Sequence, residues 1–181
     1  KADKARRLAI FFDASASARD RNRQRETAVL GAYLRALGNV EVRLVAFRND
    51  ADPALRFDVR GGDASKLLQA IDALPLDGGS SYGAINLSAV GAVDQILIIG
   101  DGLSNFGPSE PQLAASNGAR PPVQIMHAAQ SADHARLARI ARAGGGSVLD
   151  LATRSDANDA AQQLLQRNWR LLSARAVGGE C

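Results

Sequence analysis

Residues 7–17 read RLAIFFDASAS, an apolar run that stops on an aspartate and continues with alternating small and hydroxyl-bearing residues. The run at 7–12 is short and almost wholly apolar, which is typical of a strand buried on both faces of a sheet. Asp13, Ser15 and Ser17 follow it directly. Such residues can cap free backbone N–H groups at a strand-to-helix corner, or their oxygens can converge on a ligand. Taken alone, this stretch favours the cap.

The rest of the chain alternates between predicted strands and predicted helices. Apolar or alternating runs predict strands at 7–12, 40–47, 54–59, 95–99, 122–126 and 147–151. Helical spacing predicts helices at 19–37, 82–90 and 134–143. Asp63 is predicted to cap a helix that runs to 74, and Asp156 or Asn158 to cap a last helix that runs to 166. This order predicts an α/β fold with a doubly wound, mostly parallel central sheet between layers of helices. We expect one domain at 1–168 and a tail, or the start of a linker, at 169–181.

The composition is that of a globular domain, and it argues against several classes of function and site. The chain has 181 residues, 46% hydrophobic and 23% charged, with a formal net charge of +3. So small an excess, with only 4% aromatic residues, argues against nucleic-acid binding. A single cysteine, Cys181, excludes a disulfide within the chain and a multi-cysteine zinc site. No apolar run approaches the length of a membrane span. No signal peptide is visible, and the compartment is not assigned, although we favour an extracytoplasmic or cell-envelope location.

Two further loops carry oxygen-bearing side chains. DGGSSYG at 77–83 offers Ser80 or Ser81, and IIGDG at 98–102 places Asp101 after the most apolar predicted strand. In open α/β sheets, ligands gather at the carboxyl ends of strands, which favours convergence over simple capping. Carboxylates and hydroxyls without Cys or His suit Mg²⁺, with Mn²⁺ or Ca²⁺ possible, rather than Zn²⁺. Water would complete such a site, and an acidic side chain of a partner protein could replace that water.

The order of these motifs carries a resemblance. DASAS at 13–17, GGSSYGAI at 78–85 and LIIGDG at 97–102 together resemble the metal-ion-dependent adhesion site of von Willebrand factor type A domains. The resemblance covers roughly residues 7–166, and the stretch at 135–151 is similar to the penultimate helix and last strand of that family. The residues of these motifs are also similar to those of bacterial proteins in which this domain follows a vault/inter-alpha-trypsin domain.

The resemblance implies a ligand set and a function. Two serines would coordinate the ion directly, and two aspartates directly or through water: Ser15 and Ser17, and Asp13 and Asp101. The family usually has Thr directly after the glycine pair, so Ser80 takes that place, with Ser81 as the alternative, and its coordination would change when a ligand binds. The implied function is non-enzymatic: a bound Mg²⁺ accepts a Glu or Asp from a partner protein. Neither nucleic acid nor direct membrane insertion is implied.

Two rival functions stay open. GDGLSN at 100–105 resembles a motif of haloacid dehalogenase-type phosphatases, in which Asp13 would be the nucleophile and Asp101 would hold Mg²⁺. That family usually has a second aspartate where Ser15 stands here, and an aspartate where Asn105 stands. The other rival is a scaffold domain with a vestigial metal site.

The remaining polar residues near the motifs are predicted to be structural. The stretch ARDRNRQRE at 18–26 predicts a solvated helix start, with a weak pair between Arg23 and Glu26. An alternative places Arg19 and Arg21 beside the metal loop, where they would attract an acidic partner. The two histidines are predicted to be structural or surface residues rather than ligands or catalytic bases: His127 and His134.

Overall fold

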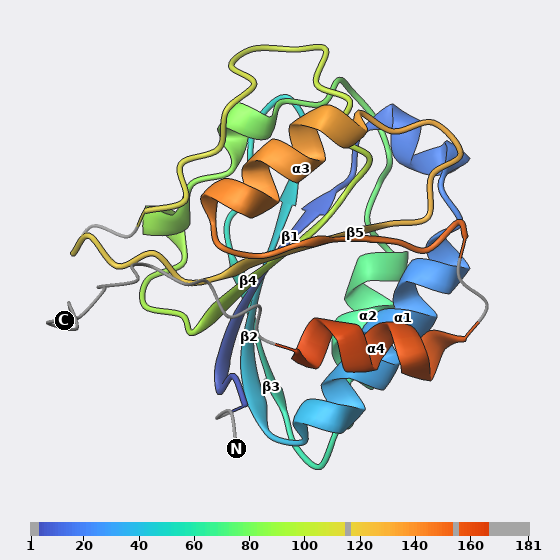
Figure 1. Ribbon diagram of the computed structural model, residues 1–181, viewed down its shortest axis with the longest axis vertical. Coiled ribbons are helices and arrows are strands. Elements are labelled where there is room, and N and C mark those ends of the chain that lie inside the picture. Colours follow the sequence, from blue (N-terminus) through green and yellow to red (C-terminus); the bar gives the residue numbers. More distant parts are fainter. Residues whose placement is uncertain (1–3, 115–116, 154–155, 167–181) are drawn as a thin grey trace, which may run out of the picture.

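A computed structural model describes residues 4–114, 117–153 and 156–166 of the chain. The predicted tail at 169–181, with Trp169 and Cys181, lies outside the described residues. A six-stranded sheet runs through the middle of the molecule and helices cover both of its faces (Figure 1). This architecture confirms the predicted α/β fold with a mostly parallel central sheet.

The strands of the sheet follow the order β3-β2-β1-β4-β5-β6. They are β1 (Arg7–Asp13), β2 (Val40–Phe47), β3 (Leu55–Val59), β4 (Gln95–Ile99), β5 (Val123–His127) and β6 (Val148–Asp150). Neighbouring strands are parallel, except that β3 pairs antiparallel with β2 at the edge. Each observed strand therefore agrees with its predicted range to within one residue at either end.

Strand β1 is the centre of the core, and both of its faces are covered. Leu8, Ile10 and Phe12 pack into the core on one face, while Ala9 and Phe11 pack on the other. This alternation follows from the two-residue repeat of a strand. The chain passes from β1 to β2 on one side, while β4 pairs with β1 on the other. The carboxyl ends of β1 and β4 therefore flank the point where the strand order reverses, where α/β sheets form their ligand-binding crevices.

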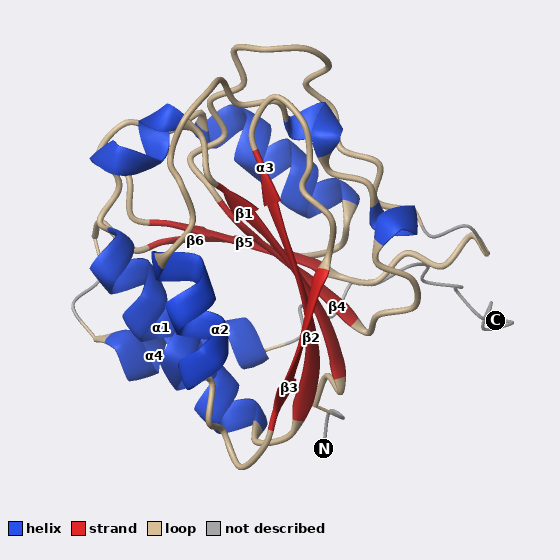
Figure 2. Cartoon of the chain, turned by 180° about the vertical axis from the view of Figure 1, so that it is seen from behind, coloured by secondary structure: helices blue, strands red, loops and turns tan. Residues whose placement is uncertain are grey.

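The helices divide between the two faces of the sheet. Figures 1 and 2 show α1, α2 and α4 together on one face and α3 on the other. Their bounds are α1 (Arg23–Leu37), α2 (Ser65–Asp72), α3 (His134–Ala143) and α4 (Ala157–Leu165). Gly38 ends α1 with a positive φ of 83°, a conformation that costs a glycine little. No helix among the described residues is long and apolar enough to cross a membrane.

The predicted helix at 82–90 is wrong. The segment instead forms two short 3₁₀ helices: η2 (Tyr82–Ala84) and η3 (Leu87–Ala89). The backbone N–H groups of Gly83 and Leu87 donate to the carbonyls of Pro108 and Gln112, at 2.8 and 2.9 Å. The loop after β4 therefore supplies hydrogen bonds that a longer helix would have made within itself.

Two other predicted helices start later than expected. The segment predicted as the first turns of a helix from residue 19 forms a separate 3₁₀ helix, η1 (Ala16–Asp20). Helix α1 then begins at Arg23, because the side chain of Asn22 accepts the N–H of Arg25 at 3.0 Å and caps it. Asp63, predicted to cap the helix, accepts the N–H of Ser65 at 3.0 Å but lies one residue before the N-cap Ala64, so α2 begins at Ser65.

Candidate metal centre

The five predicted ligands lie together at the carboxyl edge of the sheet. Asp13 is the last residue of β1, and Asp101 follows β4 by two residues. Ser80 lies in the loop before η2. Four of these side chains belong to residues that are at most 2% exposed, whereas Ser17 is half-buried. We call the five residues the oxygen cluster: Asp13, Ser15, Ser17, Ser80 and Asp101.

Hydrogen bonds join the oxygen cluster into one network. The Ser80 hydroxyl donates to Asp13 Oδ2 at 3.2 Å, and the Ser17 hydroxyl donates to Asp101 Oδ2 at 3.1 Å. The hydroxyl oxygens of Ser15 and Ser17 are 3.0 Å apart, and the Ser15 N–H donates to Asp13 Oδ1 at 3.0 Å. Side chains from three separate segments therefore point toward one another, and these bonds are more than a local cap would need.

The structure brings Ser80, and not Ser81, into the cluster. The Ser81 hydroxyl turns away and donates to the Pro108 carbonyl at 3.0 Å. The Ser80 N–H donates to Asn105 Oδ1 at 2.9 Å, and the neighbouring Gly79 N–H donates to Asn49 Oδ1 at 2.7 Å. Two asparagine side chains, neither of which was predicted to act here, thus hold the Ser80 loop in place.

Gly100 allows the backbone after β4 to approach the cluster closely. A Cβ at this position would lie 2.4 Å from the Tyr82 hydroxyl oxygen and 2.9 Å from Asp13 Cβ. The Tyr82 oxygen accepts the Gly102 N–H at 2.8 Å, and its ring packs edge-on against Phe47 with centroids 5.2 Å apart. Burial raises the pKa of Tyr82 well above 10, so Tyr82 stays a neutral packing residue beneath the cluster.

A buried ion pair lies behind the cluster. Arg21 Nε donates to Glu26 Oε1 at 3.0 Å, and both side chains are at most 1% exposed. Arg21 also donates to the Asp13 carbonyl at 3.0 Å, and its Nη1 lies 3.9 Å from Asp13 Oδ2. The prediction of a solvated arginine stretch is therefore wrong for Arg21, and Glu26 pairs with Arg21 rather than with Arg23. The alternative that put Arg21 beside the metal loop describes its position, but Glu26 balances its charge, so Arg21 adds little attraction for a distant acidic partner.

The charges at this edge leave an excess of negative charge. Glu26 balances Arg21, so the two carboxylates of the cluster, Asp13 and Asp101, are left with a formal charge of about −2. Burial raises the pKa of Asp13 above its ordinary value of 3.8, against the opposing effect of Arg21. A nearby divalent cation would favour the ionised carboxylate. Two carboxylates and three hydroxyls are hard oxygen donors, and this set fits Mg²⁺ or a similar ion.

The cluster opens to the surface at one hollow. This hollow has a volume of about 390 Å³ and is lined by Ser17, Asp20, Arg21, Asp101, Leu103, Ala129, Gln130 and Ser131. A larger hollow of about 460 Å³ lies between β3 and α2, away from the cluster. Leu103 and Phe106, in the loop after β4, are 40% and 52% exposed. Two apolar side chains therefore reach the surface in the loop that carries Asp101.

Comparisons with known proteins bear on the fold. No protein-family model and no curated protein matches the chain. An aerotolerance-related membrane protein from Bacteroides fragilis superposes with a TM-score of 0.65 at 18% identity, over 89% of this chain and 97% of that one. A von Willebrand factor type A structure from Catenulispora acidiphila gives 0.52 at 17% identity, over 86% of this chain and 40% of that one.

The von Willebrand factor type A domain of SpRpn10 gives a TM-score of 0.51 at 13% identity, over 88% of this chain and 95% of that one. At such low identities the likeness concerns the path of the backbone and not the site residues. The similarity to proteins with a vault/inter-alpha-trypsin domain stays a prediction. The chain has the fold of a von Willebrand factor type A domain.

Proposed function

We propose that this chain is a protein-binding domain that holds a divalent cation, Mg²⁺ in the first place, and uses it to accept an acidic side chain of a partner protein. The observation that carries the proposal is the oxygen cluster itself. Two buried carboxylates and three serines from three segments share one hydrogen-bonded network. The two carboxylates of this network carry a formal charge of about −2, which a bound cation would balance. Mn²⁺ or Ca²⁺ would suit the same donors.

Each member of the cluster has a role in this proposal. Asp13 and Asp101 would supply the charge that attracts the ion, and the three serine hydroxyls would supply neutral oxygen donors. When bound, the ion would act as a Lewis acid for an anionic oxygen. The two carboxylates would cancel the charge of a divalent ion only formally, because the three hydroxyls add no negative charge. The bound ion would therefore still attract a carboxylate that arrives through the hollow beside Ser17.

The surface around the hollow favours a protein rather than a small anion as the ligand that would complete the coordination of the ion. Leu103 and Phe106 are both exposed, and aromatic and other apolar side chains are typical of the buried core of protein interfaces. The side chain of Arg136 donates to the Gly102 carbonyl, and Asp133 donates its N–H to the Asp101 carbonyl at 2.8 Å. These bonds tie the start of the loop to α3.

We do not propose the rival phosphatase function, in which Asp13 would be the nucleophile; it stays a prediction. The amide oxygen of Asn105, which stands where that family has an aspartate, accepts the N–H of Ser80 at 2.9 Å. The acid that this family has at the position, and that would hold the metal there, is absent from the chain. Asn105 instead supports the backbone of a cluster residue.

Calorimetric titration with Mg²⁺ and with Mn²⁺ tests the metal half of the proposal. The wild type should bind one ion, and Asp13→Ala should bind none. The matched control is Asp20→Ala, because Asp20 is an exposed acid that lines the same hollow without joining the network, and this variant should keep its affinity. A generic phosphatase assay on the same samples should show no turnover. Turnover that depends on Asp13 would favour the phosphatase, and a wild type that binds neither ion would favour the scaffold.

Selection from a displayed peptide library tests the partner half. Peptides retained by the wild-type domain in Mg²⁺ and released by a chelator should share a Glu or Asp, and replacing that acid with Gln or Asn should abolish binding. Peptides that bind equally well in chelator, or that carry no common acid, would contradict the proposed mechanism even if the metal binds.

A further inference from the structure

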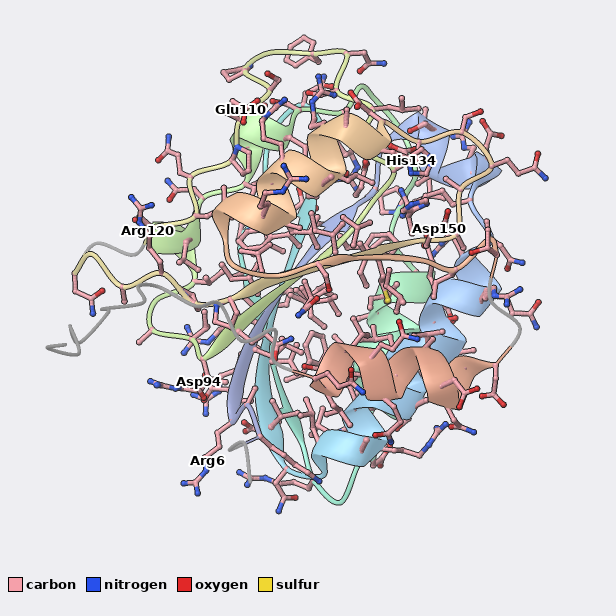
Figure 3. The ribbon with its side chains drawn as sticks, in the orientation of Figure 1. Arg6, Asp94, Glu110, Arg120, His134 and Asp150 are labelled. Carbon is pink, nitrogen blue, oxygen red and sulfur yellow. The ribbon has the colours of Figure 1, made fainter. Side chains whose placement is uncertain are left out.

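A second group of metal-ligating side chains lies at the same edge of the sheet, outside the oxygen cluster. His127 ends β5, His134 begins α3 and Asp150 ends β6. One possible ligand atom from each of the three residues lies within 4.8 Å of the others. Figure 3 shows the labelled side chains of His134 and Asp150 on the same side of the molecule, one from α3 and the other from β6. Three consecutive elements of the chain therefore bring two imidazoles and a carboxylate together.

His127 is the residue that calls for an explanation. Its side chain is fully buried, and its Nε2 has no hydrogen-bond partner among the described residues. Leaving a buried polar atom unpaired costs free energy, so such an atom often marks the place of a ligand that the protein atoms alone do not show. His134 is exposed and Asp150 is half-buried, so an ion could reach this group from the surface.

We propose that His127, His134 and Asp150 form a second metal site that prefers Zn²⁺, or a similar borderline ion such as Co²⁺, over Mg²⁺. Imidazole nitrogen suits zinc, whereas the all-oxygen cluster suits a hard ion. In a tetrahedral zinc site with ligand bonds of about 2.1 Å, ligand atoms are about 3.4 Å apart. The present separations, which are at most 4.8 Å, would therefore have to shrink by up to about 1.4 Å. His134 can supply this shift, because it is exposed and lies at the first residue of its helix.

The hydrogen bonds that His127 and Asp150 make would oppose metal binding only slightly. Asp150 Oδ1 accepts the Ala152 N–H at 2.8 Å, which holds the carboxylate in place. The Ala129 N–H donates to His127 Nδ1 at 3.4 Å, a long and weak contact. Zinc binding through Nε2 would require the ring proton on Nδ1 and would break this contact. Because the contact is weak, its loss opposes metal binding only slightly.

The test uses Co²⁺ as a visible probe and Zn²⁺ as the proposed ion. The wild type should develop the absorption bands of four- or five-coordinate Co²⁺, and zinc X-ray absorption should report two imidazole ligands. His134→Ala should weaken binding at least about tenfold and leave one imidazole in the zinc spectrum. Its exposed side chain makes this variant suitable, whereas a change at the buried His127 could prevent folding. Asp150→Asn should weaken Co²⁺ binding while both imidazoles remain.

Asp101→Asn is the matched control, because it removes a charge from the oxygen cluster and none of the three proposed zinc ligands. It should leave the Co²⁺ bands unchanged. Absence of Co²⁺ bands in the wild type, or Co²⁺ binding that His134→Ala does not weaken, would overturn the inference. So would a zinc spectrum with oxygen ligands alone that disappears in Asp101→Asn, since zinc would then occupy the oxygen cluster. The two sites share no residue, so the failure of one proposal leaves the other standing.

Discussion

Replacing Glu26 with Gln should both destabilise the protein and weaken its affinity for Mg²⁺. The variant keeps the shape of the side chain and removes the charge that balances Arg21. Arg21 and Glu26 are at most 1% exposed and 3.0 Å apart, and Glu26 also accepts the Ala128 N–H at 3.0 Å. Removing one partner of a buried ion pair leaves an unbalanced buried charge, which costs about 3–5 kcal/mol. We expect a loss near the lower end of that range, because Gln can still accept both hydrogen bonds.

The effect on Mg²⁺ follows from the position of Arg21 after its partner is neutralised. Its Nη1 already lies 3.9 Å from Asp13 Oδ2. With an effective dielectric constant of about 20, unit charges at that distance attract by about 4 kcal/mol, so Arg21 would compete with the ion for Asp13. The net charge at the cluster would fall from about −2 to about −1. We expect Mg²⁺ to bind at least about tenfold more weakly, which corresponds to about 1.4 kcal/mol.

Urea unfolding without metal, with calorimetric titration of Mg²⁺ on the same protein, separates the two effects. The control is the double variant Arg21→Met with Glu26→Leu, which removes both charges together. Removing both charges together leaves no unbalanced buried charge, so this variant should recover most of the Mg²⁺ affinity. It should recover only part of the stability, because the Asp13 carbonyl and the Ala128 N–H lose their partners. The reasoning fails if Glu26→Gln changes the free energy of unfolding by less than about 1 kcal/mol, or if the double variant binds Mg²⁺ as weakly as the single one.

Three further predictions concern the cluster. Ser80→Ala should weaken Mg²⁺ binding about tenfold in calorimetry, because it removes an oxygen that bonds Asp13, whereas Ser81→Ala should leave the affinity nearly unchanged. Because burial raises the pKa of Asp13 above 3.8 and the ion requires the carboxylate, Mg²⁺ affinity measured over a pH series should start to fall at a higher pH than an ordinary aspartate would produce. The same raised pKa favours the metal-free folded state at low pH, and this contribution is lost as pH rises through it. Gly100→Ala should lower the free energy of unfolding by about 1–3 kcal/mol in urea titrations, because its Cβ would lie 2.4 Å from the Tyr82 oxygen.

The parts of the fold that were predictable are those in which one physical cause dominates. Strands such as β1 and β4 are buried on both faces, so their sequences are apolar throughout and their bounds follow from that run. The meeting of Asp13 with Asp101 was predictable for a related reason. In a parallel sheet the loops after neighbouring strands emerge at one edge, and β1 pairs with β4.

The parts that were missed depend on contacts between distant segments. The small residues at 82–90 have helical spacing, but the bonds that shape them come from Pro108 and Gln112, which local spacing does not reveal. The stretch at 18–26 is dense in charge and so resembles a solvated helix start. One signal was available: Glu26 shares a helix face with the buried residues Leu30 and Tyr33, and an acid on a buried face requires a partner.

The most direct measurement of the central claim is an anomalous difference map from a crystal of the wild-type domain soaked in Mn²⁺. The account predicts one strong peak between the carboxylates of Asp13 and Asp101, with the hydroxyl oxygens of Ser15 and Ser17 at coordination distance, about 2.1 Å for Mg²⁺ and slightly longer for Mn²⁺. A map without density at this position, from crystals in which the five side chains are well ordered, would contradict it.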